Sequence, residues 1–549
     1  MREILLIFGA LLFFLTGCNN STSKDTVEVD NAAIDKIDEK EEQKRINAYL
    51  TDIEDLMINK KYDEAKALVE KVLKETEDIE YLSTQNSKAK ELVKIINAES
   101  AKLAGAANAY YRIVSNVVKE FGVCTRQLDY YNEDSDYREG CNGLAYANLI
   151  DFDKDGVSEL YILYVTYGAE SYIEEVWGYK DGKEVKMYSE ETDDLFGGWT
   201  SDRTVSINND GNTYINHSSR LGEVFAYDDY WTIENNVIKI TKASAEYIDG
   251  NEDSWIYKIT ENGKDRNVSE EEYNQFLNNL GHPSKKIING NAGAPAFEID
   301  ITNNLNTVMN FLNQLRTFTH QTSLENSVSK LALEKKKGII AFLNYFTELN
   351  TLDVEHYKDP EIMEFIIDAN FYNKFSEQEL PQVSSKEAIL DNHYYYPYSA
   401  ESVNQLTKKL FGITLQPKNI SVVNPDDEYD LAKYKDGYFY ILIPDIGGDN
   451  SISSPQINAL YDLGNGLYYV EFVICRVDFF DVEGLDEKYL LDPFNTWNDT
   501  EKSQSYYLTP GYAIIKEVKE NRKNTWQLVR YSTNGKLLSD AEIEQYVKN

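Results

Sequence analysis

One short segment of the chain concentrates groups that could bind a metal ion. Carboxylates at positions 151, 153, 155 and 159 surround a glycine, Gly156, that permits a sharp turn. Acidic groups this close repel one another unless a cation lies between them. Carboxylate and carbonyl oxygens are the ligands that Ca²⁺ prefers in proteins. The pattern therefore predicts a structural calcium site whose ligands are Asp151, Asp153, Asp155, the main-chain carbonyl of Val157, and Glu159.

The acidic segment resembles EF-hand-like calcium loops, and it is closer still to the loops of FG-GAP and dockerin-type modules. It departs from a true EF-hand because Ile162 stands at the twelfth position, where that family has a glutamate. An apolar run typical of a strand, Leu160 to Leu163, follows in place of a helix. The resemblance implies calcium without EF-hand pairing or switching. The alternative interpretation is an acidic hairpin turn that holds no metal.

Motifs for catalysis are scarce in the rest of the chain. The five histidines show no HExxH spacing, and neither GxSxG nor a GxxxxGK[ST] phosphate loop occurs. The SxxK match at Ser327 to Lys330 has no KTG after it. A glycosidase needs two carboxylates about 5–10 Å apart. The chain has 93 acidic residues, and the sequence alone does not identify which two of them would form such a pair. The catalytic residues, if the protein is an enzyme, stay unknown, and the sequence argues more against an enzyme than for one.

The charge balance limits the classes of partner. The formal net charge is −38, from 93 acidic and 55 basic residues. Nucleic-acid binding rests on basic side chains that neutralise phosphates, so this balance argues against it. It also argues against a polybasic face that docks on anionic lipid. The excess carboxylate serves either the solubility of a surface protein or the binding of cations.

The first residues indicate export and lipid attachment. Residues 4–15 are an apolar run that is too short to span a bilayer as a mature helix but has the size of a signal-peptide core. Leu15, Thr16, Gly17 and Cys18 follow it and resemble the lipobox of bacterial lipoproteins. The resemblance implies removal of residues 1–17, acylation of Cys18 with palmitate-type chains, and an extracytoplasmic location on the cell membrane. The alternative is an ordinary secretory signal with a chance cysteine.

Three further cysteines remain after Cys18. An exported protein can form disulfides, and Cys124 and Cys141 flank a polar segment that a bridge would close. We expect this disulfide, although spacing alone does not bring two Cα atoms within reach. Cys475 lies in an apolar strand pattern and is expected to be a buried small hydrophobe.

The pattern along the chain predicts a multidomain α+β protein. Residues 18–33 read as a flexible tether, and 34–104 as a helical stalk with apolar stripes such as Ile46, Leu50 and Ile53. The stretch from Lys61 to Leu68 resembles the second half of a tetratricopeptide repeat, with a plain three-helix spacer as the alternative. Residues 105–285 predict an antiparallel β-meander with a flanking helix, because Asp-Gly turns separate short apolar runs. A linker over 286–299 and an α+β domain over 300–549 complete the prediction.

Three function classes fit these features. The first is a surface-binding module, stabilised by calcium, for a cell-wall glycan, a peptide or a protein ligand. The second is a secreted hydrolase acting on polysaccharide or peptidoglycan, with its carboxylates unassigned. The third is a sensor or inhibitor that docks a protein partner at a strand edge. The chain as a whole resembles Gram-positive-type bacterial surface lipoproteins that carry a DxDxDG loop, which implies location and calcium but no activity.

Overall fold

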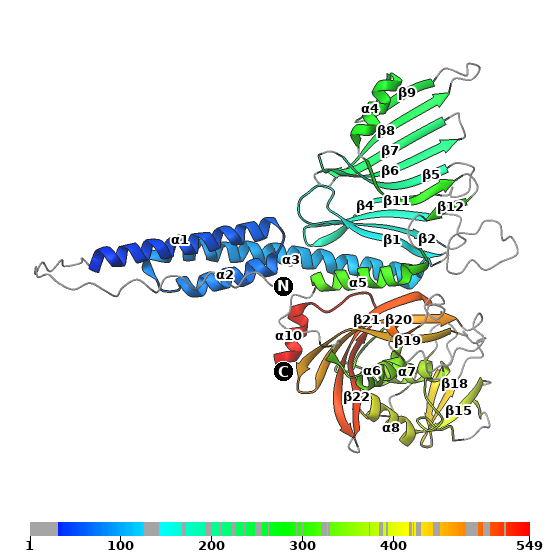
Figure 1. Cartoon of the computed structure of the whole chain (residues 1–549). Coiled ribbons are helices and arrows are strands. Elements are labelled where there is room, and N and C mark those ends of the chain that lie inside the picture. Colours follow the sequence, from blue (N-terminus) through cyan, green and yellow to red (C-terminus); the bar gives the residue numbers. More distant parts are fainter. Residues whose placement is uncertain are drawn as a thin grey trace, which may run out of the picture. The chain divides into compact units, whose positions relative to one another are not determined.

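The structure, a computed structural model, consists of two compact units, residues 1–99 and 100–549 (Figure 1). It describes residues 31–125, 142–166, 172–192, 200–208, 210–221, 225–234, 237–247, 255–261, 263–280, 282–291, 294–297, 301–319, 327, 330–372, 374–383, 388–390, 393–416, 420, 422–423, 430–442, 451–478, 492, 494–497, 505–520 and 523–548. Within these residues the fold is multidomain α+β, with an N-terminal helical region followed by β-rich regions, as predicted. The predicted tether, the signal segment and Cys18 lie mostly or wholly outside the described residues.

The first unit is a small helical bundle. Helices α1 (Asn31–Ile58) and α2 (Tyr62–Thr76) precede η1 (Glu80–Leu82) and the start of α3 (Ser83–Glu120). The predicted stripe of Ile46, Leu50 and Ile53 is buried, and it packs with Val69 and Val72 of α2. The apolar spacing along each helix therefore fixes which face is buried.

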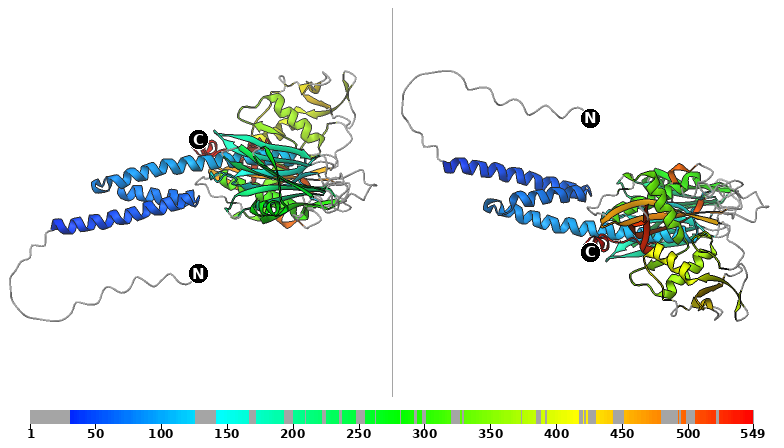
Figure 2. Two further views of the ribbon diagram at one scale, coloured as in Figure 1. Left: turned by 90° about the horizontal axis from the view of Figure 1, so that it is seen from above. Right: turned by 90° about the horizontal axis from the view of Figure 1, so that it is seen from below.

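Helix α3 does not end where the composition shifts. A break near residue 104 was expected, yet α3 continues to Glu120 without interruption (Figures 1 and 2). The glycine at this point, Gly105, has a packing role, because a Cβ there would lie 2.3 Å from the Tyr179 hydroxyl oxygen. Gly105 thus admits the Tyr179 ring against the helix, and the helix tolerates a residue of low intrinsic propensity.

The second unit begins with two packed antiparallel sheets. Sheet A has the order β1-β2-β3-β4, from β1 (Gly143–Ile150), β2 (Glu159–Val165), β3 (Tyr172–Lys180) and β4 (Lys183–Thr192). Sheet B has the order β10-β9-β8-β7-β6-β5-β11-β12. Its strands are β5 (Thr200–Ile207), β6 (Thr213–Leu221), β7 (Phe225–Glu234), β8 (Val237–Tyr247), β9 (Trp255–Glu261), β10 (Lys264–Val268), β11 (His282–Asn291) and β12 (Ala294–Phe297). The meander of β5 to β10 confirms the predicted hairpin series, and α4 (Glu270–Leu280) packs on its outer strands through Tyr273.

Strand β2 is buried along its whole length because both faces of sheet A are covered. Tyr161 and Leu163 face sheet B, where they pack with Trp231. Leu160 and Ile162 face the opposite side and pack with α3 and α5 (Asn304–Thr319). A strand buried on both faces needs a continuous apolar run, which is what residues 160–165 supply.

Helices α3 and α5 form a layer between sheet A and a third sheet (Figure 1). Sheet C has the order β13-β22-β21-β20-β19, from β13 (Thr351–Asp353), β19 (Ser451–Gly464), β20 (Leu467–Asp478), β21 (Ser505–Glu520) and β22 (Lys523–Ser532). Cys475 of β20 is buried against this layer, as expected for a small hydrophobe. One apolar core thus joins residues near 110, 310 and 470.

The other face of sheet C packs on helices and on sheet D. These helices are α6 (Leu333–Leu343), α7 (Asp359–Phe371) and α8 (Ala400–Phe411), while α10 (Asp540–Lys548) joins the core on the α5 side. Sheet D has the order β14-β15-β18-β17-β16, from β14 (Ala388–Leu390), β15 (His393–Ser399), β16 (Val422–Val423), β17 (Asp430–Lys435) and β18 (Tyr438–Leu442). Short 3-10 segments, η2 (Ile301–Asn303), η4 (Asn344–Phe346) and η7 (Phe494–Thr496), connect these elements.

The predicted division between residues 285 and 300 is not where the chain divides. Residues 286–291 and 294–297 of the expected linker belong to β11 and β12, which extend sheet B beside β5. Residues 100–549 form one compact unit, because α3 and α5 share a core with sheet C. Most of the Asn and Gly residues that suggested a linker lie at the end of β11, and two of the Ala residues lie in β12, the edge strand of sheet B. Among the helices that the structure describes, none is both long and apolar enough to cross a membrane.

Two helical glycines offer a matched test of this packing. Gly338 in α6 has no atom closer than 3.8 Å to an added Cβ, whereas Gly105 would meet the Tyr179 ring. Alanine is favoured over glycine by about 1 kcal/mol within a helix, so Gly338→Ala should raise the free energy of unfolding by up to that amount. Gly105→Ala should instead lower it by about 1–3 kcal/mol through overpacking. Thermal and denaturant unfolding measure both, and an equal gain for the two variants would contradict the packing described.

Candidate functional site

The acidic segment forms the loop between β1 and β2, where the pair Ile150 and Glu159 closes the hairpin. Two side chains fold the loop by accepting main-chain hydrogen bonds. Asp153 Oδ1 accepts from the N–H of Asp155 at 3.1 Å, and Asp155 Oδ1 accepts from the N–H of Val157 at 2.7 Å. Lys154 and Gly156 adopt positive φ values of 59° and 99°. The loop is therefore wound tightly, with its carboxylates on the inside of the turn.

The structure brings three of the four predicted side-chain ligands together, and the fifth predicted ligand, the main-chain carbonyl of Val157, stays a prediction. Asp151, Asp153 and Asp155 each offer a carboxylate oxygen within 4.8 Å of the other two. The Val157 side chain is buried, and the residue donates its N–H to Asp155. Glu159 lies apart from the three oxygens, because its buried carboxylate accepts a hydrogen bond from the N–H of Phe152 at 3.0 Å. The donor set that converges is thus three aspartates, which suits a hard cation such as Ca²⁺.

The electrostatics of the loop favour a positive charge at this point. Burial raises the pKa of Glu159 to about 8, and the charges of Asp153 and Asp155 add to the rise while the Phe152 N–H opposes it. One cation from the protein already approaches the loop, since Lys102 Nζ of α3 lies 3.1 Å from Asp155 Oδ2. Both side chains of this ion pair are more than a third exposed, so the pair is weak and screened by salt. A divalent ion could therefore compete with Lys102 for Asp155.

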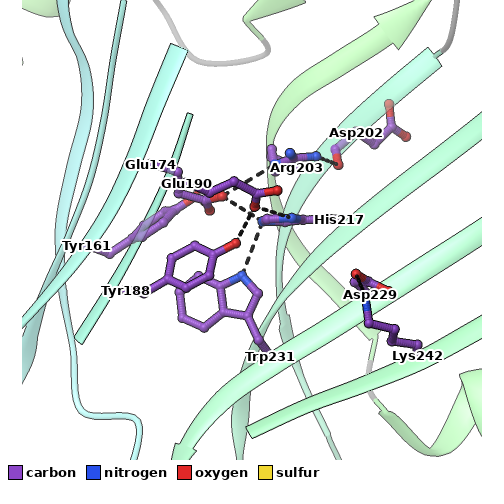
Figure 3. Close-up of polar contacts among 10 residues, drawn as sticks. All are labelled: Tyr161, Glu174, Tyr188, Glu190, Asp202, Arg203, His217, Asp229, Trp231 and Lys242. Atoms are coloured by element: carbon purple, nitrogen blue, oxygen red, sulfur yellow. Dashed lines mark hydrogen bonds and ion pairs between the residues drawn. The ribbon is translucent and has the colours of Figure 1, made fainter. Parts of the chain in front are cut away.

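A second cluster of charged residues lies between sheets A and B and was not predicted (Figure 3). His217 of β6 lies between two glutamates of sheet A. Its Nε2 is 2.6 Å from Glu174 Oε2, and its Nδ1 is 3.5 Å from Glu190 Oε2. The indole nitrogen of Trp231, in β7, lies 3.2 Å from the same Nε2. Side chains from both sheets thus meet at one imidazole ring.

The carboxylate of Glu174 is the centre of this cluster. It is fully buried, accepts a hydrogen bond from the Tyr161 hydroxyl at 2.5 Å, and lies 3.5 Å from Nε of the buried Arg203. Burial by itself would raise the pKa of Glu174, but His217, Arg203 and Tyr161 outweigh it and hold the pKa below its ordinary value. Glu174 is therefore a charged group between the two sheets.

The oxygens of Glu174 and Glu190 and a nitrogen of His217 also lie close enough together to be considered as metal ligands. Arg203 argues against that use, because its buried guanidinium already supplies the positive charge that Glu174 requires. We interpret this cluster as an ion-pair clamp between the sheets. Sequence reasoning missed it because its members come from six strands and show no local spacing.

Of the remaining predicted site residues, the structure describes Cys124 but not Cys141 or Cys18. Cys124 is buried next to β1, and its main-chain oxygen accepts a hydrogen bond from Asn304 Nδ2 at 2.9 Å. Cys141 lies outside the described residues, so the disulfide stays a prediction. The same holds for acylation at Cys18.

Comparison of the chain with models of known protein families, with curated proteins and with solved structures finds no match.

The clamp predicts a pH-dependent contribution to stability. Removing the charge in Glu174→Gln should lower the free energy of unfolding by about 3–5 kcal/mol at pH 7, because the buried Arg203 loses its counter-charge. The pKa of Glu174 is lowered on folding, so its contribution is present above its unfolded value of about 4.5 and is lost as the pH falls through the folded value. The difference between wild type and variant, measured by denaturant unfolding, should therefore shrink below about pH 4.

Glu272→Gln is the matched control, since Glu272 pairs with Arg266 and both side chains are about half exposed. This variant should cost at most about 1 kcal/mol. Equal losses for Glu174→Gln and Glu272→Gln at pH 7 would mean that the buried cluster does not clamp the sheets.

Proposed function

We propose that the protein is an extracytoplasmic lipoprotein that binds its ligand through a module stabilised by Ca²⁺ at the β1–β2 loop. The observation that carries the proposal is the convergence of the Asp151, Asp153 and Asp155 oxygens within 4.8 Å. The carboxylates come from a loop whose hydrogen bonds are internal, so the arrangement does not depend on an ion to bring them together. Preorganised acceptors of this kind lower the cost of binding a cation.

Anchorage through lipid on Cys18 is the second part of the proposal. Its support is the lipobox of residues 15–18 together with the acidic charge of the whole chain. An anchored protein with a net charge of −38 gains nothing from an anionic lipid surface, so lipid insertion supplies its membrane affinity. Removal of residues 1–17 would leave Cys18 as the mature N-terminus.

Binding is favoured over hydrolysis by the roles that nearby carboxylates already have. The pocket next to the loop is lined by two acids, Asp153 and Glu234. Asp153 belongs to the proposed cation site, and Glu234 forms an ion pair with Lys239. A hydrolase of polysaccharide or peptidoglycan needs two carboxylates that flank the scissile bond, and both acids of this pocket already have other partners, the Asp155 N–H for Asp153 and Lys239 for Glu234. A binding module is therefore the function we propose.

Calcium should raise the stability of the protein. A cation that binds only the folded state contributes RT ln(1 + [L]/Kd), which is about 0.5–2 kcal/mol for millimolar Ca²⁺ at the affinity of extracellular modules. Mg²⁺ should substitute poorly, because it demands a tighter shell and releases water reluctantly. Asp153→Asn should abolish the response. The measurement is the melting temperature with Ca²⁺, with Mg²⁺ and with chelator.

Asp181→Asn is the control for the loss of one acidic turn residue. Asp181 lies in the exposed turn between β3 and β4, adopts a positive φ of 52° that asparagine tolerates, and belongs to neither cluster. This variant should keep the full calcium response. Identical melting of the wild type in Ca²⁺, Mg²⁺ and chelator would show that the acidic loop is a turn without an ion.

Substitution of the acylated cysteine tests the anchor. Cys18→Ala should leave the protein either uncleaved or released from the membrane fraction, because no sulfur remains to accept the lipid. Detergent-phase partitioning and the mass of the mature N-terminus report the two states. Wild-type partitioning of the variant would contradict a lipid anchor at residue 18.

A further inference from the structure

A polar pocket of about 300 Å³ lies directly beside the acidic loop. Three segments form its walls: the β1–β2 loop, the start of β6 and the end of β7. Its volume is at the lower end of the range of about 300–1,000 Å³ that small-molecule sites occupy. The lining residues are Phe152, Asp153, Lys154, Asn212, Tyr214, Thr232, Ile233 and Glu234.

The walls of the pocket are positioned before any ligand arrives. Phe152 packs on Trp231 with ring centroids 5.5 Å apart, which attaches the loop to sheet B. Lys154, in its left-handed conformation, donates a hydrogen bond from Nζ to the main-chain oxygen of Asp210 at 3.0 Å. Thr232 Oγ1 donates to the oxygen of Thr213 at 2.7 Å. A site ordered in this way loses little freedom on binding.

The pocket is lined by hydrogen-bond donors and acceptors, and these include negatively charged, positively charged and neutral groups. Asp153 and Glu234 supply carboxylate oxygens, Asn212 supplies an amide, Tyr214 a phenol and Lys154 an ammonium group. An anionic ligand would be repelled by the two carboxylates, and a cationic ligand by Lys154 and by an ion in the loop. A neutral ligand whose hydroxyls both donate and accept hydrogen bonds matches this set.

The pocket shares a residue with the cation site, since Asp153 belongs to both. Ca²⁺ takes six to eight oxygen ligands, whereas the loop brings together three carboxylates. Main-chain carbonyls of the loop such as that of Val157, water, or oxygen atoms of a bound molecule would supply the remaining positions. A pair of neighbouring hydroxyls on a ring in the pocket is one source of such atoms.

We infer that this pocket binds one neutral pyranose sugar, whose adjacent hydroxyls complete the coordination of the loop cation beside Asp153. The inference rests on the proposed calcium site. It assigns the ligand class of the module as carbohydrate and makes sugar binding depend on calcium. By linkage, the sugar must tighten calcium binding by the same factor by which calcium tightens sugar binding.

The test uses ligand-observed NMR on the purified protein with four probes. D-mannose and N-acetylglucosamine are the neutral pyranoses, while acetate and ethylammonium carry the two charges. At least one pyranose should show saturation transfer in Ca²⁺ that falls about 5-fold or more in chelator, within the usual range of coupling between sites. Titration of Ca²⁺ with and without that sugar should give the same factor.

Single substitutions distinguish residues needed for sugar binding from residues needed for calcium binding. Tyr214→Phe should weaken sugar binding by about 3–10-fold, the effect of one lost hydrogen bond, and should leave the calcium melting shift unchanged. Tyr257→Phe, in β9 of the same sheet and outside the pocket, is the matched control and should bind as wild type. Asp153→Asn should lose both responses.

The outcomes distinguish failure of this inference from failure of the calcium site. Three results would each overturn the carbohydrate assignment. The first is a calcium melting shift without a signal from either pyranose, and the second is a signal from acetate or ethylammonium alone. The third is sugar binding that persists in chelator. The calcium proposal would stand in all three cases. Absence of the calcium melting shift would overturn the calcium proposal and the sugar site with it.

Discussion

The packing of sheet A on sheet B across a buried, charged contact is the constraint on which the candidate site depends. Glu174 brings a negative charge into the interface, where Arg203 of sheet B supplies the positive charge and His217 lies 2.6 Å from its carboxylate. Removing either side would leave a buried charge without its partner, so this contact favours one packing arrangement of the two sheets. Trp231, which contacts His217, is also the ring on which Phe152 of the acidic loop packs. The position of the loop therefore follows from the same interface.

The loop and the pocket gain their chemistry from this rigid base. Phe152 points inward at the start of the loop, and its N–H is held by Glu159 at the end. The carboxylates of the aspartates at alternating positions converge with one another. Glu159 thus supports the loop from within, and the acidic residues of a single sequence motif divide into two roles. Such a division is common where some residues bind and their neighbours orient them.

Much of the fold could be predicted from local sequence pattern. The stripe of Ile46, Leu50 and Ile53 predicts a buried helix face, and the turn at Asp181 and Gly182 predicts the hairpin of β3 and β4, because both signals lie within a few residues. The acidic loop was found for the same reason. The clamp around His217 could not be found, because its partners come from other strands and are chosen by sheet packing. The predicted boundary near residue 104 lies close to the division of the chain between residues 99 and 100, although α3 runs through it without a break. No division falls near residue 286, because β11 pairs with β5 and its tertiary contacts override the local signals of glycine and asparagine.

A crystal structure determined in millimolar Ca²⁺ is the most direct test of the central claim, that the β1–β2 loop is a cation site. The account predicts one ion, identified by anomalous scattering, at about 2.3–2.6 Å from oxygens of Asp151, Asp153 and Asp155. It also predicts that Lys102 Nζ moves away from its position 3.1 Å from Asp155 Oδ2. Two results would contradict the claim that this loop is a cation site. One is an ordered loop with no ion bound and Lys102 still paired to Asp155. The other is an ion held instead by Glu174, Glu190 and His217.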